Sequence, residues 1–122
     1  PTPVPPATDT MAFEEIPDGR GYTGPYRGRV VARFCGTAGR SREDVATASD
    51  ALGGQRVEGG DFAARFDVFP FVPITVIWYD GGEEFPPGAS FLYQNNITSI
   101  FDVEDVVVVS ERLVSRLSGK PW

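Results

Sequence analysis

The clearest pattern of hydrophobic and polar residues runs through the middle of the chain, from residue 61 to residue 93. At its start, apolar residues alternate with small or charged ones, which predicts a half-buried strand. The alternating apolar residues are Phe62, Ala64, Phe66 and Val68. Residues 74–79 are apolar on both sides apart from Thr75, which predicts a central strand. Residues 89–93 supply a third strand, and prolines and glycines mark the intervening turns.

Two stretches before this region repeat apolar residues at the helical period. The first helix is expected to begin at Pro25 and to end at Gly36. Its apolar stripe consists of Tyr26, Val30, Val31 and Phe34. The second helix is expected to begin after Ser41, with Asp44 at the reciprocal position of a capping box, and to end before Gly53.

A last helix is expected to follow Asp102, which suits the N-cap position. Residues 106–109 are all valine and would also suit a strand. The helical period nevertheless continues to Leu117, and this length favours a helix.

These elements predict a single α+β domain over residues 12–122, preceded by a proline-rich extended arm at residues 1–11. The expected sheet is mostly antiparallel and has three to four strands, with about three helices packed on one face. Residues 11–16 suit a short strand or a single turn, and residues 56–57 suit a short strand.

Composition narrows the classes of function. The chain of 122 residues carries a formal net charge of −6, so a phosphate backbone or an anionic membrane surface would be repelled. We therefore expect neither a nucleic-acid partner nor a membrane partner. No apolar run is long enough to cross a bilayer, and the start lacks the basic and apolar regions of a signal peptide.

The chain has one cysteine, Cys35, and no histidine. A lone cysteine excludes a disulfide within the chain and is most simply placed in a reducing, cytoplasmic setting. Without histidine the chain lacks the usual general base and the commonest transition-metal ligand. We accordingly expect no catalytic residue, no metal and no cofactor, and we interpret Cys35 as a packing residue.

Two groups of side chains are candidates for binding a ligand or a partner. The first is an acidic turn at the end of the second main strand, which would suit a hard cation or acid–base chemistry but also a solvated turn. The second is an arginine–tyrosine patch on the first helix, which would suit an anionic ligand or an acidic partner. The candidate residues are Tyr22, Tyr26, Arg27, Arg29, Arg33, Trp78, Asp80, Glu83 and Glu84.

Several segments together resemble a known family. They are F-E-E-I-P-D-G-R-G-Y-T-G-P-Y-R-G-R-V-V at 13–31, A-L-G-G at 51–54, G-G-D at 59–61, the stretch 69–93 and the closing D-V-E-D-V-V-V-V-S-E-R-L-V-S-R-L. On these segments the chain is similar to the C-terminal portion of domain of unknown function 3786, found in anaerobic bacteria and archaea. The resemblance implies a cytoplasmic protein of anaerobic metabolism, near corrinoid or methyl-transfer systems. Some members carry a cysteine-rich iron–sulfur segment, and the single cysteine here means that no cluster is carried over.

Three hypotheses for function follow. The first is a non-catalytic binding or accessory domain that docks to a protein partner or takes a small anionic ligand. The second is a small enzyme that uses carboxylates of the Asp80–Glu84 loop together with an arginine of the first helix. The third is a structural protein that forms a homodimer through the aromatic face of its sheet. The aromatic residues expected on that face are Phe62, Phe66, Phe69 and Phe71.

Overall fold

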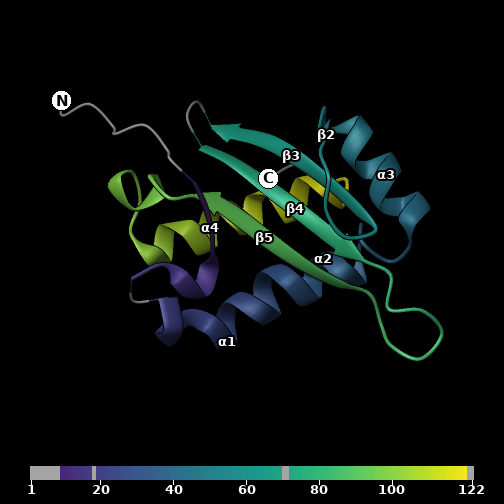
Figure 1. The fold of residues 1–122 in the computed structure, drawn as a ribbon, viewed down its shortest axis with the longest axis horizontal. Helices are drawn as coiled ribbons and strands as arrows, with labels where there is room; N and C mark the ends of the chain where they lie inside the picture. Colours follow the sequence, from purple (N-terminus) through teal and green to yellow (C-terminus); the bar gives the residue numbers. More distant parts are fainter. Residues whose placement is uncertain (1–8, 18, 70–71, 121–122) are drawn as a thin grey trace.

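The computed structural model describes residues 9–17, 19–69 and 72–120. It contains a five-stranded antiparallel sheet with the strand order β1-β5-β4-β3-β2 (Figure 1). The strands are β1 (Thr10–Ala12), β2 (Gln55–Arg56), β3 (Phe62–Phe69), β4 (Val72–Tyr79) and β5 (Gly88–Gln94). The predicted α+β class is confirmed, and β4 is the central strand, as its apolar sequence indicates.

The sheet has five strands rather than the three to four expected. The additional strands lie at the two edges, where β1 has three residues and β2 has two. Segments this short show no alternating pattern, because their pairing depends on the neighbouring strand rather than on their own sequence. Within the predicted arm, residues 1–8 lie outside the described residues, whereas Thr10 and Met11 belong to β1.

The first predicted helix is continuous from residue 23 to residue 36 but changes its winding. It consists of α1 (Thr23–Tyr26), a π-helical segment η3 (Arg27–Ala32) and α2 (Arg33–Gly36). Its predicted stripe is confirmed, since Tyr26, Val30 and Phe34 are all buried.

The other two helices begin at the predicted caps. In α3 (Arg42–Ala51), the Ser41 hydroxyl accepts a hydrogen bond from the Asp44 N–H at 3.1 Å. In α4 (Val103–Leu117), the Asp102 carboxylate accepts one from the Asp105 N–H at 2.9 Å. The run of four valines therefore lies in a helix, because its helical period places an apolar face against the core.

The core lies between one face of the sheet and the helices. Phe62 and Phe66 point into it and are only 5% and 4% exposed. They are buried within this chain and so do not form an aromatic surface for a second copy. The side chain of Phe69, and Phe71 as a whole, lie outside the described residues.

Two glycine substitutions should have opposite effects on stability. In Gly81→Ala the new Cβ would clash with the carbonyl oxygens of Phe85 and Pro86, so we expect a loss of roughly 1–3 kcal/mol. In Gly28→Ala the new Cβ meets nothing within 4 Å on a helix, so we expect a gain of about 0.5–1 kcal/mol. Urea denaturation of both variants measures the difference, and shifts in the same direction would contradict this description.

Candidate functional site: a groove beside the free edge of β5

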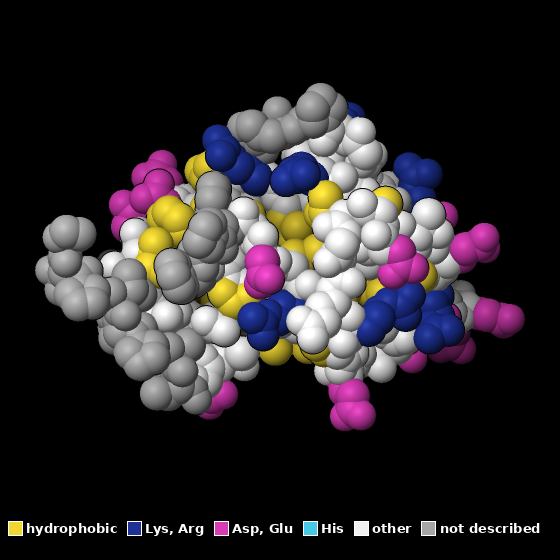
Figure 2. Space-filling view, turned by 90° about the horizontal axis from the view of Figure 1, so that it is seen from above, with side chains coloured by type: hydrophobic (Ala, Val, Ile, Leu, Met, Phe, Trp, Pro, Cys, Tyr) yellow, Lys and Arg dark blue, Asp and Glu magenta, His cyan; other side chains and the backbone are white. Residues whose placement is uncertain are grey.

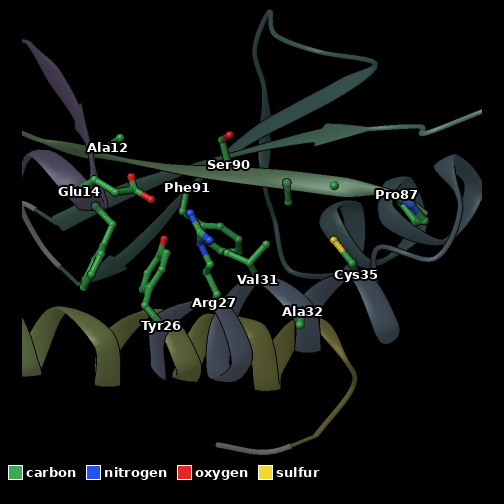
Figure 3. Close-up of a pocket in the computed structure, with 13 residues that line it drawn as sticks. Ala12, Glu14, Tyr26, Arg27, Val31, Ala32, Cys35, Pro87, Ser90 and Phe91 are labelled. Carbon is green, nitrogen blue, oxygen red and sulfur yellow. The ribbon is translucent and has the colours of Figure 1, made fainter. Parts of the chain in front are cut away.

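A groove of about 410 Å³ lies between β5 and the helix at residues 23–36. Figure 3 shows Tyr26, Arg27, Val31 and Cys35 directed from the helix towards the strand. The lining residues are Ala12, Phe13, Glu14, Tyr26, Arg27, Val31, Ala32, Cys35, Pro87, Gly88, Ala89, Ser90 and Phe91. The lining thus combines the end of β1, one side of the helix and the first half of β5.

The β5 side of the groove is an unpaired strand edge. β1 pairs with β5 only as far as Ala12 opposite Leu92, where the chain turns into the 3-10 segment η1 (Phe13–Glu15). In the part of the chain that the structure describes, no strand therefore lies beside Gly88–Phe91 on this side.

The orientation of the backbone along this edge follows from the pairing with β1. The Asn95 N–H donates to the Asp9 carbonyl at 2.9 Å, so residue 95 turns its hydrogen-bonding groups towards β1. Successive residues of a strand turn these groups to opposite sides. Ala89 and Phe91 therefore direct their N–H and C=O groups towards the side of β5 that β1 occupies further along, while Ser90 directs its own towards β4. On this side Phe91 is buried at 3% exposure, whereas Ala89 is part-exposed.

The π-helical segment shapes the opposite wall. Arg27, Val31 and Ala32 all belong to η3 and all line the groove. In a π-helix the hydrogen bonds join residues five apart, so residues four and five apart lie on one side of the helix. Such segments are rare in proteins and often occur at functional sites. The local winding therefore brings these side chains together towards β5.

The groove has an apolar interior and carries charge of both signs. Val31, Cys35 and Phe91 contribute apolar surface. Glu14 and Arg27 contribute one carboxylate and one guanidinium to the lining. Burial raises the pKa of the half-buried Cys35 thiol, so this group is protonated at neutral pH and is a weak nucleophile.

Cys35 should consequently react slowly with thiol reagents. We expect the native protein to be alkylated by a maleimide more slowly than the urea-unfolded chain at pH 7, because less thiolate is present and access is through the groove. The rate should rise as the pH increases towards the raised pKa. Mass spectrometry of the alkylated protein measures both rates, and a native rate equal to the unfolded rate would show that Cys35 is an open surface thiol.

A buried chain of hydroxyl groups lies behind the groove. The Tyr26 and Tyr93 oxygens are 2.8 Å apart, and the Tyr93 and Ser110 oxygens are 2.6 Å apart. The Ser110 hydroxyl donates to the Val106 carbonyl at 2.7 Å, so it must accept from Tyr93, and Tyr93 must accept from Tyr26. This directed chain joins the first helix, β5 and α4, and it holds the groove wall in place.

The two tyrosines predict a loss of stability in alkali. Burial raises the pKa of Tyr93 to about 12, and burial together with Tyr93 raises the pKa of Tyr26 above its usual range. Both pKa values are higher in the folded protein than the value of about 10 in the unfolded chain, so ionisation of these tyrosines favours unfolding. Their contribution to the stability of the fold is complete below pH 10 and declines as the pH rises further. Tyrosinate absorbance from these residues should therefore appear together with unfolding. Full ionisation of all tyrosines in a protein that retains native circular dichroism would contradict this expectation.

The residues of the predicted arginine–tyrosine patch lie in different environments. Tyr26 is 3% exposed and belongs to the core, where its ring stacks on Phe13 with centroids 3.9 Å apart. Arg27 lines the groove, whereas the Arg29 guanidinium donates to the Glu111 carboxylate on α4.

The remaining predicted residues of the patch, Tyr22 and Arg33, are half-buried. Figure 2 views the molecule from above, whereas the first helix lies at the bottom of Figure 1; on the face that Figure 2 shows, basic and acidic side chains are interspersed. Tyr22 precedes the helix, and positions three to seven apart on the helix itself face different neighbours, which the sequence alone does not distinguish.

The predicted acidic turn is exposed. The Asp80 carboxylate accepts the Gly82 N–H at 3.2 Å, while Glu83 and Glu84 are exposed. Within the described ranges, no ion pair joins these acids to the helix arginines, and no group of three possible metal-binding side chains is found. Trp78, predicted beside this turn, is instead buried at 1% exposure.

The comparisons with known proteins identify the family. The model of the domain of unknown function DUF3786 matches residues 2–116, so the chain belongs to this family. Neither the curated proteins nor the solved structures gave a match. Among the described residues, no helix has both the length and the apolar character needed to cross a membrane.

Proposed function

We propose that this chain is a non-catalytic binding domain that docks a protein partner in the groove beside β5. The observation that carries the proposal is the combination of an apolar groove with an unpaired strand edge. Natural edges are usually short, charged or covered, because unpaired backbone groups invite association. Gly88–Phe91 carry no charged side chain, and the first three of these residues are part-exposed beside the groove.

The groove suits binding better than catalysis. The thiol in its lining, Cys35, has a raised pKa, which opposes the thiolate form that attack requires. Glu14 and Arg27 are the charged residues of the lining, and mixed charge of this kind is a poor match for a small anion. We place the domain in the cytoplasm as an accessory component of anaerobic metabolism, a setting supported by the family resemblance and the lone cysteine.

Photo-crosslinking from the groove tests the proposal. Arg27, an exposed residue of the lining, is replaced with a smaller amino acid that carries a diazirine, and the protein is irradiated in an extract of its source cells. In a matched control the same amino acid replaces Thr47, which is exposed on α3. We expect a discrete adduct with one protein from position 27 and none from the control. Adducts of equal yield from both positions, or none from either, would contradict docking in the groove.

A further inference from the structure

We propose that the occupant of the groove is an extended segment of a protein partner that adds to β5 as a further strand. This inference rests on the proposed binding function and specifies the kind of partner. β1 already occupies the adjoining part of the same edge, through pairs from Thr10 opposite Gln94 to Ala12 opposite Leu92. The added strand would continue the line of β1 along Gly88–Phe91. At about 3.3 Å per residue, this edge accommodates roughly four residues.

The backbone groups at the part-exposed edge match a polypeptide better than a small molecule. Ala89 directs one N–H donor and one C=O acceptor towards the open side of β5, next to the edge that β1 covers. An antiparallel strand satisfies both groups with a pair like those that β1 makes further along.

The pairing also determines which side chains of the partner enter the groove. Residues that face each other across paired strands project to the same side of a sheet. Ala89 lies opposite the buried Trp78, so it faces the helices. Partner residues opposite Ala89 and Phe91 therefore project between β5 and the helix, where they meet Val31 and Cys35.

The intervening partner residues project the other way. They lie opposite Gly88 and Ser90, and the Ser90 side chain points away from the groove in Figure 3. The structure thus assigns a sequence pattern to the occupant: apolar residues at alternate positions, with polar residues between them. A groove of about 410 Å³ limits the combined size of the apolar side chains that it can take.

Selected peptides provide the probe. Short linear peptides displayed on phage are selected against the full chain, and binding of the synthetic peptides is measured by fluorescence polarisation. Hydrogen exchange of the β5 amides is followed by NMR with and without peptide. In the free protein the Ala89 amide should exchange faster than that of Ser90, which is bonded to β4. The peptide should slow exchange at Ala89 and leave Ser90 unchanged.

A proline variant tests the backbone contact. Ala89→Pro removes the N–H that faces the partner, while proline at an outward-facing edge position leaves the bonds to β4 intact. We expect peptide binding to weaken at least about tenfold. Ala89→Val adds similar bulk but keeps the N–H, and it should weaken binding less.

The outcomes separate this inference from the proposed function. A peptide that protects Cys35 from maleimide but does not slow exchange at Ala89 would overturn strand addition and leave the groove a binding site. A selection that returns no peptide with alternating apolar residues would overturn it as well. A dimer in sedimentation whose dissociation exposes the Ala89 amide would make a second copy the occupant, again overturning the inference.

Discussion

Replacing Trp78 with alanine should lower the free energy of unfolding by about 3–5 kcal/mol, the usual range for removing a large aromatic side chain from a core. Trp78 lies on the central strand at 1% exposure. Its indole N–H donates to the Gly39 carbonyl at 2.7 Å, which ties the loop after the first helix to the sheet. The substitution therefore removes apolar contacts and leaves a buried carbonyl without its donor.

A graded series of variants separates these two contributions. Trp78→Phe keeps most of the apolar volume but removes the donor, so it should cost less than the alanine variant and still about 1–3 kcal/mol. Tyr79→Ala is the neighbouring control on a residue that is 43% exposed, and it should cost less than either. Chemical denaturation followed by circular dichroism measures the series. A loss from Trp78→Ala no larger than that from Tyr79→Ala would show that Trp78 does not anchor the core.

Tyr93→Phe should destabilise the protein by about 1–3 kcal/mol, because the hydroxyl at the centre of the buried chain is lost. Tyr26 would then hold a buried O–H with no acceptor, and Ser110 would lose its incoming donor. Ser110→Ala should have a comparable effect, since it leaves the Tyr93 O–H without an acceptor.

The direction of the hydrogen bonds makes a sharper prediction. Tyr26 is the first donor in this series of hydrogen bonds and accepts none of them. Tyr26→Phe therefore leaves only an unfilled acceptor on Tyr93. An unfilled lone pair costs less than an unsatisfied buried donor, so Tyr26→Phe should be the mildest of the three substitutions. Thermal unfolding at matched pH ranks them. A result in which Tyr26→Phe is the most destabilising would reverse the assigned direction.

Much of the fold could be predicted because the information is local. The alternation that begins at Phe62 indicates β3, and Ser41 and Asp102 mark the starts of two helices. β1 and β2 could not be predicted with the same certainty, because two or three residues have no period of their own.

Less of the candidate site could be predicted from the sequence. Tyr26 and Trp78 are aromatic residues close to charged ones, a pattern that does not distinguish a surface site from a core position. The groove depends on where β1 leaves β5 and on where a π-helical segment crosses below, and both are properties of the tertiary arrangement. The small, uncharged residues at 88–90 were the available signal, since they indicate a strand edge without protection.

The rate of Cys35 alkylation tests the central claim, that the groove is the docking surface, most directly. The partner recovered by crosslinking is purified and titrated against the native protein and against a control that combines Cys35→Ala with Thr47→Cys, which moves the thiol to an exposed position on α3. If the partner docks in the groove, the rate at Cys35 falls with partner concentration to a plateau, while the rate in the control remains constant. An unchanged rate at Cys35 when the partner is saturating, or an equal fall at both positions, would contradict the account.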